Sequence, residues 1–322
     1  MKTISIHIVT FNSGTDIERC LESIKQQSYP ICQIIIIDNN SKDNTVNVIK
    51  KSFRIQGLTL VQNNTNNGFA GGHNQAIRLS ESDYVLVLNP DVILHPDYVF
   101  KLVNAMEKDA SLGSATGKLY RSLDDKVLDS TGLIVKKNRR AFDRGAGEKD
   151  RGQYDPGKDL FGVSGAASMY RREMIDNVSI DGQFFDETFF AYKEDVDVAW
   201  RAQLFGWKAL FVPDAIAIHK RGWQGENKRS QISLAIRKHS YINRYYTMLK
   251  NDSYLFIILH LPIILFYEAL SFCYAIIKER EILGAWKNFK YNYSDMMKKR
   301  KLIKYKQKTP SSNVFRYFKG IW

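Results

Sequence analysis

The most constraining feature of the sequence is an apolar run of strand length, residues 84–88, that ends directly in Asn89, Pro90 and Asp91. A continuous run of valine and leucine predicts a parallel β-strand that is buried on both faces. In open α/β sheets, ligands bind beyond the carboxyl ends of such strands. Asp91 is therefore expected to face a ligand or a metal ion.

Two earlier apolar runs, residues 4–9 and residues 34–37, end in the same way. The polar residues that follow them are Thr10, Asn12, Asp38 and Asn40. Apolar spacing predicts a helix over residues 16–27, a capped helix from Ser41 to Lys51, a strand over 58–61 and a helix over 73–79. This alternation predicts an α/β fold with a doubly wound, mostly parallel sheet of Rossmann-like type, and right-handed crossovers align its strand ends along one crevice.

The pattern changes after the fourth strand. Residues 122–162 are polar and contain glycine and a basic cluster at 136–140, so we expect a mobile or acceptor-facing insertion. Further on, the pattern predicts a helix at 198–205 and strands at 163–170, 209–212 and 216–218. The last of these strands ends at His219.

The C-terminal part has a different character. Residues 254–277 form a 24-residue stretch that is almost wholly apolar, long enough to span a bilayer, but it contains His260, Pro262 and Glu268. We expect a helix that is broken at the proline and lies in the membrane interface. The alternative is an ordinary buried helical hairpin or a dimer contact.

The positive charge is concentrated behind this stretch. Residues 278–308 contain eleven Lys and Arg against three acids, which accounts for +8 of the net charge of +13. A basic tail beside an apolar helix favours an anionic membrane surface over nucleic acid, because no aromatic stacking platform accompanies it. The three cysteines lack metal-ligand or CxxC spacing and no signal peptide opens the chain, so we expect a cytoplasmic protein attached peripherally to the inner face of the cell membrane.

Several polar residues have the placement of ligand-binding groups. Asp38 can accept hydrogen bonds from a nucleotide base or ribose, although a helix-capping role beside Ser41 is the alternative. The glycine-containing loop at 66–74 offers amides to phosphate or sugar hydroxyls, or forms a plain turn. No GxGxxG follows the first strand, which argues against hydride transfer by a dinucleotide enzyme.

Two further groups have the composition of catalytic sites. Asp91 and His219 can together bind a divalent ion that a diphosphate and water also coordinate, although one histidine is more often structural. Glu194, Asp195 and Asp197 lie near a helix start, where one acid can act as a base toward a hydroxyl. The alternative for these acids is the solvated first turn of an ordinary helix.

In this order and spacing, the motifs resemble those of the family 2 inverting glycosyltransferases with the GT-A fold, and within them the rhamnosyltransferase-like branch. The resemblance covers about residues 3–222 and rests on the segments at 9–12, 37–41, 67–74, 89–91, 185–190, 194–197 and His219. It implies a catalytic domain at 1–222, whereas the C-terminal helical, membrane-associating appendage expected at 223–322 rests on composition.

The resemblance also implies roles for individual residues. Asp195 is the expected catalytic base with Glu194 beside it, and Asp91 and His219 are the expected ligands of Mg²⁺ or Mn²⁺. The residues expected to bind the nucleotide sugar are Thr10, Asn12, Asp38, Asn40, Asn67, Gly72, Asn74, Asn89 and Asp91. The DxD carboxylate pair of the family appears here as Asn89-Pro90-Asp91, as in the rhamnosyltransferase-like branch, and the lost charge predicts weaker metal binding.

The expected reaction is transfer of a sugar, with rhamnose from dTDP-rhamnose favoured, to a hydroxyl of a glycan or polyprenyl-diphosphate-linked acceptor in bacterial surface polysaccharide synthesis. One rival is a sugar nucleotidyltransferase, but residues 10–16 contain no Lys or Arg for a diphosphate loop. The other is a membrane-attached protein that binds nucleotide sugars or acts as a scaffold without catalysis.

Overall fold

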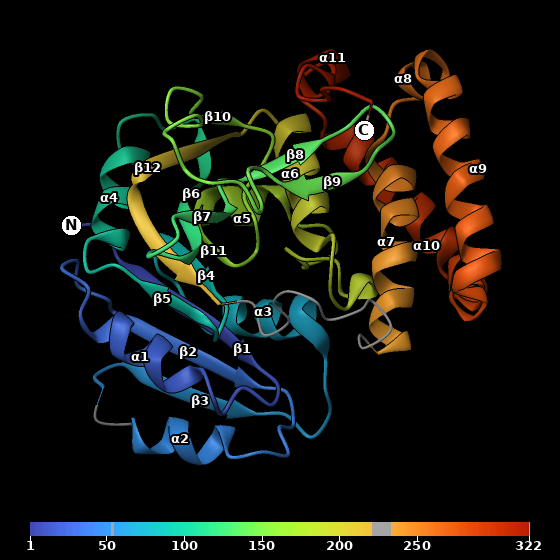
Figure 1. The fold of residues 1–322 in the computed structure, drawn as a ribbon. Coiled ribbons are helices and arrows are strands. Elements are labelled where there is room, and N and C mark those ends of the chain that lie inside the picture. Colours follow the sequence, from blue (N-terminus) through green and yellow to red (C-terminus); the bar gives the residue numbers. More distant parts are fainter. Residues whose placement is uncertain (53–54, 221–232, 322) are drawn as a thin grey trace.

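The computed structural model describes residues 1–52, 55–220 and 233–321. The chain opens with alternating strands and helices: β1 (Ile4–Thr10), α1 (Ile17–Lys25), β2 (Gln33–Asp38), α2 (Thr45–Lys51), β3 (Leu58–Gln62), α3 (Gly68–Arg78) and β4 (Tyr84–Leu88). These four strands are parallel and lie in the order β4-β1-β2-β3. The predicted doubly wound opening is therefore confirmed (Figure 1).

The second half of the sheet is mixed. Its elements are β5 (Val92–Leu94), α4 (Tyr98–Met106), β6 (Leu112–Ser122), β7 (Val127–Ser130), β10 (Asp159–Leu160), β11 (Ala167–Arg171), α5 (Arg172–Val178), α6 (Glu194–Leu204) and β12 (Lys208–His219). β11 runs antiparallel between β4 and β6, and β12 runs parallel to β6. The strands predicted at 209–212 and 216–218 form one strand with a register shift between Val212 and Ile216, so the prediction of two separate strands was wrong.

The run of four isoleucines in β2 explains how the sheet is held. Ile34 and Ile36 pack into the core beneath α1, α2 and α4, whereas Ile35 and Ile37 pack on the opposite face with Ala76 of α3. All four side chains are at most 2% exposed. Complete burial of each isoleucine side chain stabilises the fold by about 1.5–3 kcal/mol. Because these side chains point to both faces of the sheet, helices must cover both faces.

Two sequence-based expectations are corrected here. The helix expected from residue 73 begins at Gly68, because the glycines let α3 approach the sheet closely: a Cβ on Gly72 would lie 2.7 Å from Val9 Cγ2. The insertion at 122–162, which we expected to be mobile, folds into β7, the β8 (Leu133–Val135) and β9 (Ala141–Asp143) hairpin, and β10. Arg139 of its basic cluster is buried.

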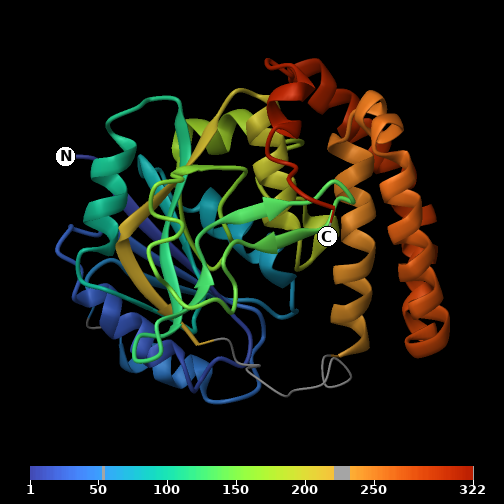
Figure 2. The same cartoon turned by 45° about the horizontal axis from the view of Figure 1, so that its top comes forward.

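The C-terminal part is helical. It comprises α7 (Leu234–Asn251), α8 (Tyr254–Leu259), α9 (Leu261–Lys278), α10 (Ala285–Lys306) and α11 (Ser311–Phe315), with a short 3₁₀ turn, η3 (Arg280–Gly284), before α10. Another 3₁₀ turn, η1 (Glu187–Phe189), lies earlier in the chain, before α6. Figures 1 and 2 place α7 beside the sheet region and α9 at the outer edge of the molecule. The predicted boundary at residue 222 lies outside the described residues.

The C-terminal helices share the core of the sheet region. Phe315 and Phe318 pack edge-on against Trp200 of α6, with ring centroids 6.0 and 5.0 Å away. Lys299 and Arg300 of the basic segment are 7% and 6% exposed, so not all of that segment is a free solvent-facing tail. The α10 helix therefore supports the fold as well as carrying charge.

The apolar stretch breaks as the proline predicts. α8 ends at Leu259, and α9 starts at Leu261 with Pro262 in its first turn. By length and composition α9 is apolar enough to cross a membrane, yet only 11% of it is buried within the molecule. Its surroundings in this chain are therefore not those of a buried helical hairpin.

Candidate active site

The ends of β1 and β2 form a hydrogen-bonded cluster. Thr10 Oγ1 donates to Asp38 Oδ1 at 2.9 Å, and the Ser41 hydroxyl donates to the same oxygen at 2.6 Å. Asp38 is 2% exposed and its second oxygen accepts the Ser41 amide. The side-chain oxygen of Asn12 accepts a hydrogen bond from the Lys42 amide at 2.8 Å, and the Asn12 amide donates to the Ser41 hydroxyl at 2.9 Å. The structure thus joins these three predicted residues to one another through short local bonds.

The other predicted residues of this edge are also engaged by the protein. Asn40 donates to the carbonyl of Asn64 at 2.8 Å, and Asn67 accepts from the Thr65 hydroxyl at 3.1 Å. Asn74 is buried and exchanges hydrogen bonds with the backbone of Phe185. Gly72 packs against Val9 of β1. Gly72 and Asn74 therefore both hold α3 in place against the rest of the fold.

Asp91 and His219 lie side by side, as the shared strand edge predicted. β5 pairs with β12 so that Val92 stands opposite His219, which brings His219 Nε2 to 3.3 Å from Asp91 Oδ1. The imidazole is 5% exposed. Its other nitrogen, Nδ1, lies 2.7 Å from Asp129 Oδ2.

Asp129 is the functional candidate that the sequence did not reveal. It lies within β7, one residue before the end of the strand, is completely buried, and reaches His219 across 90 positions of the chain. Burial alone lowers the pKa of His219, but hydrogen bonds to Asp129 and Asp91 outweigh it and raise the pKa to about 9. The only signal in the sequence is an acid inside a strand pattern.

The acids expected before a helix occupy its first turn, because α6 starts at Glu194 rather than near residue 198. Asp195 accepts the backbone amides of Gly165 at 3.2 Å and of Val196 at 2.8 Å. Burial and then the neighbouring Asp195 charge raise the pKa of Glu194, and burial also raises the pKa of Asp195. Two adjacent buried carboxyl groups cannot both ionise easily, so this pair holds a proton more tightly than ordinary acids do.

One cavity of about 820 Å³ unites the two groups of predicted residues. Asn89, Asp91 and His219 line one part of it, and Glu194 and Asp195 line another. Residues 141–143 of β9 also line it, so the inserted hairpin contributes to the site. The described lining does not include Thr10, Asn12, Asp38, Asn40, Asn67, Gly72 or Asn74.

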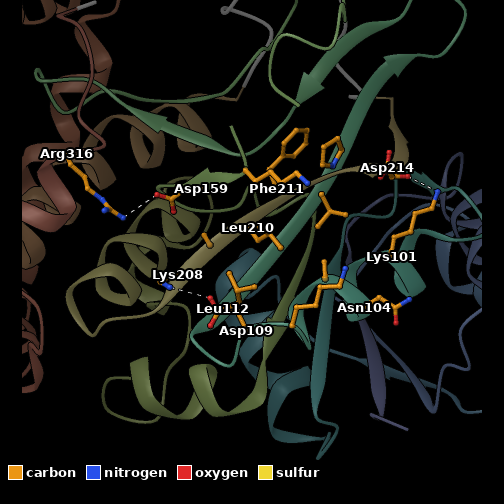
Figure 3. Close-up of a pocket in the computed structure, with 16 residues that line it drawn as sticks. Lys101, Asn104, Asp109, Leu112, Asp159, Lys208, Leu210, Phe211, Asp214 and Arg316 are labelled. Carbon is orange, nitrogen blue, oxygen red and sulfur yellow. Dashed lines mark hydrogen bonds and ion pairs between the residues drawn. The ribbon is translucent and has the colours of Figure 1, made fainter. Parts of the chain in front are cut away.

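A second cavity, of about 720 Å³, lies along the first half of β12, away from His219 (Figure 3). Three of its cations are engaged: Lys208 pairs with Asp109, Arg316 pairs with Asp159, and Lys101 donates to the carbonyl of Asp214. None of the predicted site residues lines it among those described. The candidate active site is therefore the cavity at Asp91 and Asp195.

The donor set at this cavity fits a divalent ion. Asp91 offers a carboxylate oxygen and His219 offers Nε2, while Asp129 fixes the imidazole through its other nitrogen, a common arrangement behind metal-binding histidines. The described residues contain no cluster of three or more possible ligands. Two protein ligands suffice where phosphate oxygens and water complete the coordination of Mg²⁺ or Mn²⁺.

Sequence comparison decides the family. The family described as Glycosyl transferase family 2 matches residues 5–179. The chain belongs to this family. This match confirms two predictions: that the protein is a glycosyltransferase, and that it belongs to family 2.

The similar proteins whose functions are known include the poly-beta-1,6-N-acetyl-D-glucosamine synthases of Staphylococcus epidermidis and Staphylococcus aureus. The first is 24% identical over 213 residues, which is 66% of this chain and 48% of that protein. The second is 24% identical over 216 residues, 67% of this chain and 49% of that protein. The chain thus spans about half the length of these relatives.

Solved structures with the same fold include GalNAc-T7 with UDP, GalNAc and Mn²⁺ (TM-score 0.58, 14% identity, 78% of this chain and 48% of that one). They also include the mannosyltransferase PcManGT from Pyrobaculum calidifontis with GDP-Man and Mn²⁺ (TM-score 0.55, 15% identity, 95% of this chain and 86% of that one). At these identities the likeness concerns the fold, and it confirms the predicted GT-A type architecture.

Proposed function

We propose that this chain is an inverting glycosyltransferase that moves a sugar from a nucleotide-diphosphate donor to a hydroxyl group of an acceptor. The observation that carries the proposal is the single cavity lined by Asp91 and His219 together with Glu194 and Asp195. The first pair suits a metal-bound diphosphate, and the second pair suits proton removal from a hydroxyl. Membership of the family, whose match covers residues 5–179 and so includes Asp91, supports the reaction class.

Asp195 is the proposed base. Its two backbone hydrogen bonds fix the carboxylate, and burial raises its pKa and thereby its affinity for a proton. Asp195 takes the proton of the acceptor hydroxyl while that oxygen bonds to the anomeric carbon and the bond to the donor diphosphate breaks. The attack from the opposite side inverts the anomeric configuration, and no covalent enzyme intermediate forms.

The remaining residues hold the reactants. Glu194 orients the acceptor or the base. Asp91 and His219 would hold a divalent ion, which would offset negative charge on the departing diphosphate. Thr10, Asn12 and Asp38 are proposed to hold the nucleoside, through the cluster at the ends of β1 and β2. Asn89 lines the cavity beside Asp91 and is proposed to contact the ribose or a metal-bound water.

For the donor and the acceptor we propose chemical classes. We favour dTDP-rhamnose on the resemblance to the rhamnosyltransferase-like branch alone, and the acceptor is proposed to be a glycan or a polyprenyl-diphosphate-linked sugar. The related proteins are poly-beta-1,6-N-acetyl-D-glucosamine synthases, which supports the proposed role in bacterial cell-surface polysaccharide synthesis. UDP-linked and GDP-linked sugars belong in the same donor test, since structural neighbours were solved with UDP and GDP-Man.

We also propose peripheral attachment of the cytoplasmic protein to the inner face of the membrane. Ile258, Leu265 and Ile277 of α8 and α9 are 67%, 57% and 73% exposed. Lys278, the last residue of α9, and Lys287 of α10 are exposed as well. Exposed apolar groups with nearby cations are the combination that binds anionic lipid.

The catalytic proposal is tested with Asp195→Asn in the full chain. Purified protein is screened against dTDP-, UDP- and GDP-sugars, with and without Mn²⁺, for binding and for slow release of the nucleotide. We expect the variant to bind the donor like the wild type and to lose transfer by about a hundredfold or more. An active Asn variant contradicts the base assignment, whereas a wild type that binds a donor without turnover favours the scaffold alternative.

The membrane proposal is tested by flotation with vesicles that contain phosphatidylglycerol. A variant with serine at Ile258, Leu265 and Ile277 is expected to stay in the pellet fraction, while the wild type floats. Leu79→Ser is the control, because Leu79 is 48% exposed at the end of α3. Equal flotation of all three proteins would remove α8 and α9 as the membrane contact.

A further inference from the structure

One side chain of α7 holds the loop that leads into the catalytic acids. Asn243 is completely buried, and its Nδ2 lies 2.8, 3.0 and 2.8 Å from the carbonyl oxygens of Phe189, Ala191 and Tyr192, so that its two N–H groups are shared among three acceptors. These carbonyls precede Glu194 by two to five residues. A residue more than 45 positions downstream therefore fixes the backbone immediately before the proposed base.

The loop needs such support. Phe190, Tyr192 and Lys193 have φ values of +61°, +72° and +73°, a region that side chains other than glycine disfavour. A strained backbone of this kind persists only where surrounding contacts over-determine it. On its other side the loop contacts α3, where the Ala70 amide donates to the Phe190 carbonyl at 3.1 Å.

The loop also contributes directly to the cavity. Ala191, Tyr192 and Lys193 are among its lining residues, together with Glu194 and Asp195. Lys193 donates to the carbonyl of Ala141 at 3.0 Å, which joins the loop to the hairpin across the cavity. A shift of this loop would therefore move both the base and the lining.

We propose that Asn243 is a positioning residue for catalysis: its three hydrogen bonds hold the strained loop at 190–193 so that Asp195 faces the acceptor hydroxyl. The inference rests on the proposed function of Asp195. Asn243 itself contacts no reacting atom and does not line the described cavity. It acts by fixing the entry to α6.

Neighbouring contacts explain why α7 can serve as this support. The next residue, Arg244, pairs with Glu268 of α9, and the Tyr245 hydroxyl donates to the same carboxylate. Two turns further along α7, Lys250 bridges Asp186 and Asp197, which lie on either side of the loop. The α7 helix is thus fixed both to the apolar helix and to the catalytic helix.

The test compares Asn243→Asp with Thr247→Val in the full chain. Asn243→Asp keeps the side-chain volume but replaces the donor with an acceptor that faces three carbonyls. Thr247 is a matched control, because it is buried one turn along α7 and its hydroxyl donates only to the Asn243 carbonyl of the same helix. The measurements are kcat, donor Kd and hydrogen exchange of the amides at 189–197.

We expect Asn243→Asp to lower kcat by about a hundredfold, since a misplacement of about 1 Å can have that effect, while donor Kd changes less than about threefold. Exchange at 189–197 should accelerate in this variant and stay unchanged in Thr247→Val. If Asn243→Asp does not fold, Asn243→Ser, which keeps one donor, should show the same pattern with a smaller loss of kcat. A kcat within twofold of the wild type, or a loss of kcat equal to that of Thr247→Val, overturns the proposal.

The exchange measurement separates this inference from the proposed function. If the wild type transfers no sugar, the proposed function fails, and with it the catalytic meaning of Asn243. Faster exchange at 189–197 in Asn243→Asp would then still show that Asn243 orders the loop. Unchanged exchange in an active enzyme would instead refute the positioning role alone.

Discussion

The buried charge of Lys250 offers the sharpest test of how the C-terminal helices are joined to the sheet region. Its ammonium is 1% exposed and lies 2.6 Å from Asp186 Oδ2 and 2.8 Å from Asp197 Oδ2. Lys250→Met keeps the volume but leaves two buried carboxylates short of one cation. Removal of one member of a buried ion pair typically lowers the free energy of unfolding by 3–5 kcal/mol.

The stability lost in Lys250→Met should lie near the lower end of this range. Asp186 keeps Lys299 at 2.8 Å, and Asp197 keeps Arg201 at 3.0 Å, so each carboxylate retains one cation. We therefore expect about 3 kcal/mol, a large part of the roughly 5–15 kcal/mol that stabilises a typical domain. Urea unfolding followed by tryptophan fluorescence and circular dichroism measures the difference.

The effect should depend on pH in a defined direction. Although burial raises it, Lys250 and Lys299 hold the pKa of Asp186 well below its usual range, and Lys250 and Arg201 lower the pKa of Asp197. Carboxyl groups with a lowered folded-state pKa contribute stability above their unfolded pKa of about 4, and this stability is lost as the pH falls further. The difference between wild type and Lys250→Met should therefore be full at pH 7 and smaller near pH 3.

Lys298→Met is the control, because Lys298 is exposed on α10 beside the buried Lys299. It should change the free energy of unfolding by less than about 0.5 kcal/mol at both pH values. A Lys250→Met loss that is below about 1 kcal/mol, or that is the same at pH 7 and pH 3, would refute the electrostatic reasoning.

Two further predictions concern the metal site and the approach of α3. Asp129→Asn should weaken Mn²⁺ binding in the presence of nucleoside diphosphate by about 10–100-fold, measured by calorimetry, because His219 loses its carboxylate partner; unchanged affinity would contradict this role. Gly68→Ala should lower the free energy of unfolding by about 3 kcal/mol, since φ is +71° and the new Cβ would meet the Phe190 carbonyl oxygen. Gly182→Ala is the control, because Gly182 has φ +74° and a Cβ there would meet no atom within 4 Å, so only the backbone conformation should lower the free energy of unfolding, by about 1 kcal/mol. Equal losses of stability in the two variants would show that the clash with the Phe190 carbonyl does not contribute.

The sequence predicted the parts of the fold that rest on local pattern. Apolar runs of strand length locate β1, β2 and β4, and the connection rules align their carboxyl ends. For that reason Asp91 and His219, from strands far apart in the chain, could be expected at one edge. Their separation of 3.3 Å depends on the pairing of β5 with β12, which only the structure gives.

The features that the sequence did not predict depend on long-range partners. Asp129 looks like any acid in a weak strand until its contact with His219 is known. Gly68 reads as a loop residue because glycine has a low helix propensity, but it begins α3 and lies against the Phe190 carbonyl, far away in the sequence. Lys299 reads as a solvated basic charge, but Asp186, which it meets, lies 113 positions earlier.

The C-terminal helices therefore have two faces with different roles, and this decides how membrane binding can be studied. Their inner face places Lys250 and Lys299 beside Asp186 and packs Phe318 against Trp200, whereas α8 and α9 expose apolar side chains outward. Truncation near residue 251 would remove Lys299 and Phe318 and leave buried carboxyl groups and aromatic rings uncovered. A truncated protein that failed to float would then report damage to the fold as readily as loss of a membrane contact. Substitutions confined to the exposed positions of α8 and α9 leave the inner face intact, so only they can assign flotation to these helices.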